Sequence, residues 1–178
     1  MAHIFAKMCV LTIPNRNPGT TRGQLNMIEA IDHVNLVVTD LQVMTQFYAE
    51  VLGFAVSKRV AISGPWVEKV TGTSGVEAKV VYLDPPQGPR IELIQYLSPS
   101  AARPTALDKP YVPGIRHIAF RVSDIDQVAG DLEASGARLV SPVQQVPDSQ
   151  ATYSGGARKR LVYFLDPEEN LLELCEYR

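Results

Sequence analysis

This chain of 178 residues has few cysteines and little net charge. The two cysteines, Cys9 and Cys175, lie far apart and form no Cys-x-x-Cys pair, which argues against a disulfide framework and against a structural zinc site built from thiolates. The formal net charge is −2, so the chain lacks the basic field that nucleic-acid binding needs. No apolar run approaches the roughly 20 residues that a membrane-spanning helix needs. We therefore expect a cytoplasmic protein without a nucleic-acid or membrane partner.

The first 27 residues lack the patterns found later in the chain. Their one apolar run, residues 8–13, is short and is followed by Pro14 and Pro18. It has neither the long apolar core nor the cleavage site of a secretory signal. We interpret residues 1–27 as an N-terminal extension outside the main fold.

A repeated phrase is the most informative feature that is present. The stretch IDHVNLVVTD begins at Ile31, and IRHIAFRVSD begins at Ile115. A second pair of similar segments lies at the ends of the two halves of the chain: YLDPPQGPRIELIQY from Tyr82 resembles YFLDPEENLLELCEY from Tyr163. Repeats of this length indicate two similar structural modules.

Each half is predicted to contain a strand, a helix and three further strands. After each opening strand, apolar residues recur at three- and four-residue steps, which is typical of an amphipathic helix. Asp40 and Asp124 are placed to cap the starts of these helices, and Gly53 and Gly136 to end them. The later strands are expected at residues 55–62, 78–83 and 90–97, and at residues 138–142, 160–165 and 170–177.

The predicted fold is therefore α+β, with two βαβββ modules forming a curved, cup-shaped mixed sheet that has its helices on one face. We divide the chain into the extension 1–27, a first module 28–97, a proline-rich linker 98–114 and a second module 115–178.

Alternation along the strands predicts which side chains face away from the helices. The aliphatic and aromatic residues of the opening strands, together with leucine and isoleucine of the last strands, share the face toward the helices. Four ionisable residues are left on the other face, and these are His33, Glu92, His117 and Glu173. They could be separate surface residues, but their neighbours Ile94, Tyr96, Cys175 and Tyr177 suit a cavity wall better than a solvated surface.

Two imidazoles and two carboxylates form a mixed nitrogen and oxygen donor set. Such a set suits divalent first-row metal ions. A bound cation can polarise a substrate carbonyl, while one carboxylate takes a proton from the adjacent carbon and a second returns it. Glu92 and Glu173 are the candidate catalytic base and acid.

The phrases IDHVNLVVTDL, IELIQY, IRHIAFRVSDID and DPEENLLELCEY resemble the pattern of the vicinal oxygen chelate superfamily. That superfamily groups glyoxalase I, methylmalonyl-CoA epimerase, extradiol dioxygenases and bleomycin- or fosfomycin-resistance proteins, and the resemblance extends over about residues 28–178. It implies a glyoxalase-like fold and a homodimer. In some members of the superfamily, the two halves of a site come from different subunits. It also implies that His33, Glu92, His117 and Glu173 hold a divalent metal ion, which could be nickel, cobalt, zinc, manganese or iron.

The four-residue set resembles that of glyoxalase I or an epimerase. We therefore expect a metal-dependent lyase or isomerase that shuttles a proton next to the metal-bound carbonyl of a small substrate, such as a thioester or a hemithioacetal. Two alternatives remain open: a ring-cleaving dioxygenase of the extradiol type, and a metal-free resistance protein that binds an antibiotic or another small molecule.

Two loops and one further glutamate could shape the substrate site. Residues 63–75 contain Trp66, which could cover the site as a lid or plug the core. The basic stretch 153–160 could receive an anionic group or form a solvated hairpin. Glu77 could act as an additional glutamate or be an exposed residue at a strand start.

Overall fold

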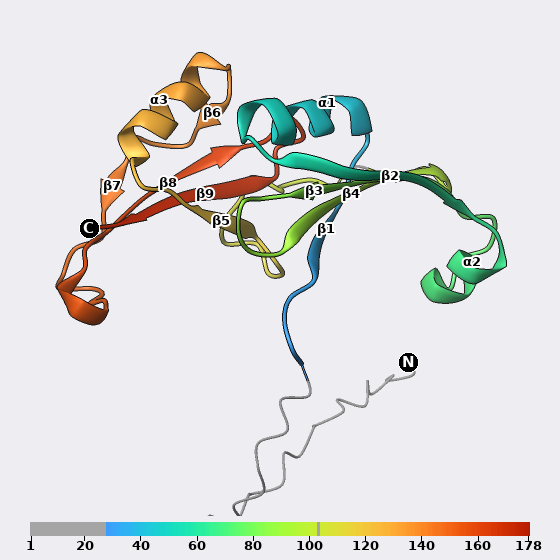
Figure 1. Ribbon diagram of the computed structural model, residues 1–178, viewed down its shortest axis with the longest axis horizontal. Coiled ribbons are helices and arrows are strands. Elements are labelled where there is room, and N and C mark those ends of the chain that lie inside the picture. Colours follow the sequence, from blue (N-terminus) through green and yellow to red (C-terminus); the bar gives the residue numbers. More distant parts are fainter. Residues whose placement is uncertain (1–27, 103) are drawn as a thin grey trace, which may run out of the picture. The chain divides into compact units, whose positions relative to one another are not determined.

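The repeated sequence forms two modules of strand, helix and further strands in the computed structural model, which describes residues 28–102 and 104–178 (Figure 1). Both modules lie within one compact unit, Ile31–Arg178. The predicted extension 1–27 lies outside the described residues.

The first module is a four-stranded mixed sheet with the strand order β1-β4-β3-β2. β1 runs parallel to β4, and the other neighbouring pairs are antiparallel. Its elements are β1 (His33–Val37), α1 (Leu41–Gln46) continued by a π-helical turn (Phe47–Val51), β2 (Ala55–Ser63), α2 (Pro65–Thr71), β3 (Glu77–Asp84) and β4 (Arg90–Ser98).

The second module repeats this plan with the strand order β5-β9-β8-β6, and the short strand β7 also pairs with β8. The strand expected at 138–142 is only two residues long, and Pro142, at its expected end, has no N–H to donate to a sheet ladder. The elements are β5 (His117–Arg121), α3 (Ile125–Ala134), β6 (Arg138–Leu139), β7 (Gln144–Gln145), a 3₁₀ turn (Ser154–Gly156), β8 (Lys159–Leu165) and β9 (Leu171–Tyr177).

The α+β class and the repeated modules are thus confirmed. In the part of the chain that the structure describes, strands pair only within a module, so the joining of both sheets into one cup stays a prediction. None of the described helices is long and apolar enough to cross a membrane.

The predicted helix ends are confirmed. The carboxylate of Asp40 accepts hydrogen bonds from the backbone N–H groups of Gln42 and Val43, both at 3.0 Å, and Asp124 accepts one from Gln127 at 3.0 Å. These bonds satisfy donors that have no partner inside the helix. After α3, Gly136 adopts φ = 87°, which only glycine adopts without steric cost.

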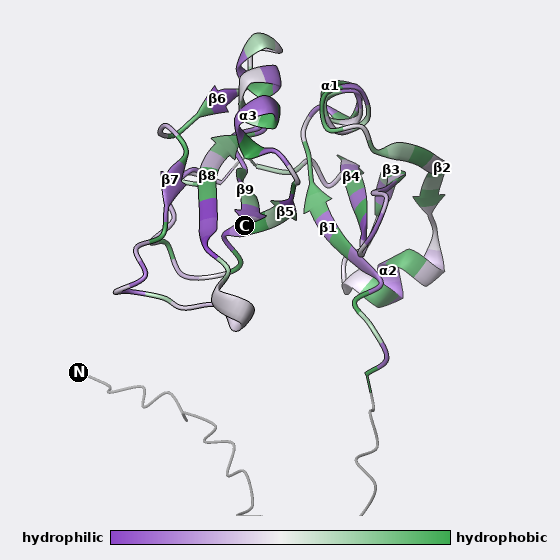
Figure 2. Ribbon diagram, turned by 60° about the vertical axis from the view of Figure 1, so that its left-hand side comes forward, coloured by the Kyte–Doolittle hydropathy of each residue, from purple (hydrophilic) through white to green (hydrophobic). Residues whose placement is uncertain are grey.

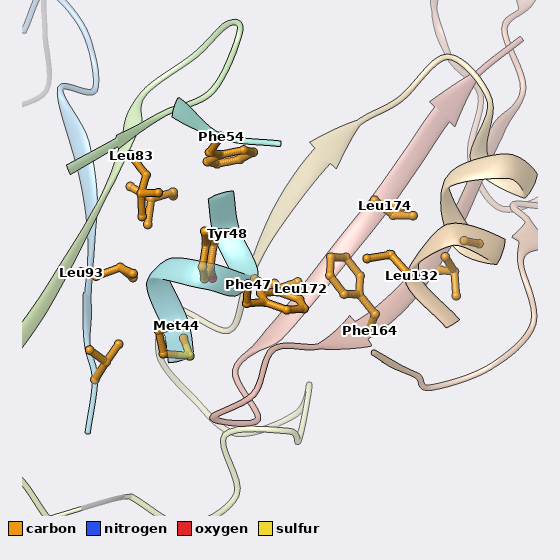
Figure 3. Packing of buried hydrophobic residues seen from close by; sticks show 14 of the residues in the cluster. Met44, Phe47, Tyr48, Phe54, Leu83, Leu93, Leu132, Phe164, Leu172 and Leu174 are labelled. Atoms are coloured by element: carbon orange, nitrogen blue, oxygen red, sulfur yellow. The ribbon is translucent and has the colours of Figure 1, made fainter. Parts of the chain in front are cut away.

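The main apolar core lies between the helices and the sheets and includes side chains of both modules (Figure 3). Met44 and Tyr48 of the first helix and Phe164 of β8 are fully buried in it. The Phe54 and Phe120 rings, one from each module, meet edge to face with centroids 5.6 Å apart. The predicted helix-facing residues all lie in this core or pack against it, namely Val34, Leu36, Val38, Ile91, Leu93, Ile118, Phe120, Val122, Leu172 and Leu174.

A buried carboxylate also joins the two modules. Glu168, in the turn between β8 and β9, accepts hydrogen bonds from the backbone N–H of Thr39 at 2.8 Å, from the Thr39 hydroxyl at 2.9 Å and from the backbone N–H of Asp40 at 2.7 Å. These bonds hold the end of β1 and the start of α1 against the second module.

Candidate metal centre

His33 and Glu92 come together across the parallel strands β1 and β4. Asn35 stands opposite Glu92 in the register, with His33 two residues before it on the same face. Nε2 of His33 lies 3.4 Å from Oε2 of Glu92. The histidine side chain is 40% exposed and the glutamate 15%, so this first pair is reachable from solvent.

Three neighbours orient the first pair. Nδ1 of His33 lies 2.8 Å from the Asp32 carboxylate, and the hydrogen bond from His33 lowers the pKa of Asp32. A ring that donates from Nδ1 keeps its lone pair on Nε2, the atom that faces Glu92. Asn35 donates to Oε2 of Glu92 at 2.7 Å. Hydrogen bonding to Glu92 raises the pKa of Tyr82 to about 12, so this hydroxyl keeps its proton.

His117 and Glu173 form an equivalent second pair in the other module. Nε2 of His117 lies 3.4 Å from Oε2 of Glu173, the same separation as in the first pair. The histidine side chain is 35% exposed, whereas the glutamate is only 4% exposed. Tyr163 stands opposite Glu173 in the register, and its ring centroid lies 5.2 Å from that of His117.

A lysine distinguishes the second pair from the first. Nζ of Lys159 lies 2.7 Å from Oε1 of Glu173. Burial alone would lower the pKa of Lys159, but the Glu173 carboxylate outweighs this effect and raises it, so the side chain is an ammonium ion. The sequence pattern started β8 at Arg160 and left Lys159 in the loop, which hid this contact.

The geometry of each pair fits two adjacent ligand positions on one cation. With metal–ligand bonds of about 2.1 Å, neighbouring donor atoms lie about 3.0–3.4 Å apart. In the second pair, Lys159 would have to leave Oε1 of Glu173 before a cation could use that oxygen. In the described residues, no three His, Cys, Asp or Glu side chains are grouped so as to hold a metal ion. The structure thus assembles each pair, and the four-ligand centre remains a prediction.

The other candidate residues are placed as follows. Trp66 lies on α2 and is 57% exposed, so it does not plug the core, and a lid role stays untested. Glu77 is an exposed residue at the start of β3. In the stretch 153–160, Arg158 pairs with Asp148 at 3.6 Å and Arg160 with Asp126 at 2.6 Å.

The structure also contains a cavity of about 1210 Å³. Its walls come from the β3–β4 turn (85–89), the end of the first helix, and β5 with the residues that follow it. Arg121 is the one lysine or arginine among the described residues that line it. None of the four predicted ligands lies in this wall.

Comparisons with known proteins agree with this architecture. Residues 30–174 match the family model described as Glyoxalase/Bleomycin resistance protein/Dioxygenase superfamily. The chain is 27% identical to protein YaeR of Escherichia coli, over 84% of this chain and 97% of YaeR. It is 28% identical to a 2-epi-5-epi-valiolone epimerase of an Actinomyces species, over 82% of this chain and 78% of the epimerase. The crystal structure of a glyoxalase family protein from Bacillus cereus superposes with a TM-score of 0.70 at 25% identity, covering 86% of this chain and 97% of that one. The chain therefore belongs to the Glyoxalase/Bleomycin resistance protein/Dioxygenase superfamily.

Proposed function

We propose that this chain is a metal-dependent lyase or isomerase that moves a proton at the carbon next to a substrate carbonyl. The observation that carries the proposal is the His–Glu pair at the same 3.4 Å separation in both modules. The relationship to a protein named as an epimerase agrees with this reaction class.

The residues that would hold the metal are His33, Glu92, His117 and Glu173. When bound, a divalent cation would polarise the carbonyl of a thioester, hemithioacetal or similar small substrate. The partly exposed histidines would face the incoming ligand, while the more buried glutamates would be held in place by their neighbours.

The two glutamates differ in a way that separates their roles. Glu92 accepts a hydrogen bond from the neutral amide of Asn35, whereas Glu173 is engaged by the ammonium of Lys159. We assign the acceptance of the substrate proton to the Glu92 carboxylate. The proton returned to the carbon would come from Glu173, which would first take it from the Lys159 ammonium, and Lys159 would regain a proton from solvent as Glu92 releases its own. A carboxylate without a lysine on it is the better proton acceptor.

We further propose that a second copy of the chain completes each site. Each pair needs two more donors, and in the described part of one chain no third candidate ligand joins either pair. A symmetric dimer would bring the first pair of one copy to the second pair of the other, twice over.

A metal-free binding protein is the second candidate, and Lys159 is the observation in its favour. Its ammonium already balances the charge of Glu173, so the second pair is stable without a cation.

Metal stoichiometry and subunit complementation test these proposals together. We would measure metal content for the wild type, for a variant with His33→Ala and Glu92→Ala, for a variant with His117→Ala and Glu173→Ala, and for both variants coexpressed. Glu133→Ala, at an exposed position of α3, is the matched control. We expect full loading of the wild type and the control, and none of either variant alone.

The coexpressed variants distinguish a site that is shared between two copies of the chain from a site that lies within one copy. Half of the dimers would contain both variants, and each of these would have one intact site of two, so about a quarter of the wild-type metal content should return. No recovery would show that each site lies within one chain. Full loading of either variant alone would refute the four-ligand assignment, and a wild type that binds no metal would favour the binding protein. Proton exchange in deuterium oxide, followed by NMR on a panel of thioesters and hemithioacetals, would then test the reaction class.

A further inference from the structure

On the sheet face that bears the His–Glu pairs, each module has a tyrosine at the matching position, but the residues around this tyrosine differ between the modules. In the first module, Tyr96 stands opposite Ala78 and packs with a small apolar cluster of buried Ala78, Val80 and Ile94. In the second module, the matching Tyr177 stands opposite Lys159. The hydrophilic start of β8 is visible in Figure 2.

A second cation, Arg121, lies at the end of β5, the first strand of the second module. Val37 ends β1 beside Ile94, whereas Arg121 ends β5 beside Cys175 at the matching position. The guanidinium carbon of Arg121 lies 5.4 Å from the centre of the Tyr177 ring, and Nζ of Lys159 lies 6.0 Å from the same centre. Two cations therefore flank one aromatic ring.

The fold does not require these cations. The first module builds the same strands in the same register with Val37 and Ala78 at these positions. Lys159 is balanced by Glu173, but Arg121 is exposed and forms no ion pair with the described residues. Of the two cations beside Tyr177, only Lys159 thus has a carboxylate partner among the described residues. Arg121 and Tyr177 also line the 1210 Å³ cavity, whose described lining residues include Arg121 as the one lysine or arginine and Glu50 and Asp131 as carboxylates.

We propose that Arg121 and Lys159, on either side of Tyr177, bind an oxyanion group of the ligand, which is a carboxylate or a phosphate. A guanidinium fork and an ammonium are the side chains best suited to such a group. This inference deepens the proposed function, since it defines the substrate as anionic, and it rests on that function only for placing the reacting carbonyl near the His–Glu pairs. If a cation took over the Glu173 carboxylate, Lys159 would become available to the same anion.

The first module supplies the test variants. Arg121→Val and Lys159→Ala copy Val37 and Ala78 from the matching positions, and Arg121→Gln is a polar second variant. Arg59→Val is the matched control, because Arg59 is an exposed arginine on β2, at the edge of the other sheet, and forms no ion pair with the described residues. Calorimetry on the full chain, with malonate and with inorganic phosphate as probes, would measure the dissociation constants with and without added divalent metal.

We expect saturable binding of at least one probe to the wild type and to Arg59→Val. Either substitution of Arg121 should weaken binding about tenfold or more, because a charge-assisted contact is lost. Lys159→Ala should weaken anion binding without weakening metal binding, which a merely structural lysine would not do. The probe that binds more tightly identifies the carboxylate or the phosphate.

Wild-type affinity in both Arg121 variants, or the absence of saturable binding of either probe, would overturn the inference. The second outcome would leave Arg121 as a charge that protects the edge of β5. The metal-free arm separates this inference from the proposed function. Loss of anion binding in the Arg121 variants of a protein that takes up no metal would support the anion site and refute the metal-dependent reaction.

Discussion

Replacement of Glu168 by alanine tests the connection between the modules. The Glu168 carboxylate is buried and holds Thr39 and Asp40, about 130 residues earlier in the sequence, through two backbone N–H groups and one hydroxyl. Alanine would leave these donors without their acceptor, and because Thr39 and Asp40 are exposed, water would replace only part of the lost bonds. The variant should therefore unfold more easily than the wild type.

The magnitude follows from the donors that are lost. A hydrogen bond to a charged group contributes about 1.5–3 kcal/mol, and the three bonds are not additive because they share one carboxylate. Since the burial of the Glu168 charge is also relieved, we expect the free energy of unfolding to fall by about 3 kcal/mol in total. For a chain of this size, that corresponds to a melting temperature lower by about 6–12 °C. Glu168→Gln keeps one carbonyl acceptor and should cost about 1–2 kcal/mol.

Urea unfolding with two probes provides the assay. Far-UV circular dichroism reports on both modules, and the fluorescence of Trp66, the single tryptophan, reports on the first. In Glu168→Ala the two transitions should separate, whereas in the control Glu133→Ala they should coincide near wild-type stability. A Glu168→Ala variant within about 0.5 kcal/mol of the wild type, with coincident transitions, would refute the assigned connection.

Three further substitutions test the core and the surface charges. Phe164→Ala removes a fully buried ring and should lower the free energy of unfolding by about 3–5 kcal/mol in urea titrations, and a loss below about 1 kcal/mol would contradict its place in the core. Tyr48→Phe removes a hydrogen bond to Asp166 at 3.3 Å and should cost about 1 kcal/mol, so an unchanged stability would show that the bond contributes nothing. The hydrogen bond from Arg160 lowers the pKa of Asp126 in the folded protein below the unfolded value of 3.8. The contribution of this bond to stability is therefore present above pH 3.8 and is lost as the pH falls through the lower pKa of the folded state. As the pH is lowered from about 5, Asp126→Asn should therefore lose less stability than the wild type in urea titrations. An unchanged pH profile would refute this contribution.

Features that depend on near neighbours in the chain could be predicted from the sequence. The two matched phrases predicted the repeated modules, and the helix caps at Asp40 and Asp124 depend on groups only two or three residues away. Alternation along β1 and β5 placed His33 and His117 opposite the helices, because successive side chains of a strand point to opposite faces. The same rule brought Glu92 and Glu173 to those histidines once the strands were paired.

Contacts between distant segments were decided only by the tertiary structure. The sequence offers no local signal that Glu168 binds Thr39, since the partners are joined only when the two modules pack. The contact of Lys159 with Glu173 depends on where β8 begins, and a shift of one residue would turn that side chain to the other face. Arg121 and Tyr177 meet because β5 lies parallel to β9 in one particular register. Local patterns encode the direction in which each side chain points, whereas its partner is set by packing over the whole chain.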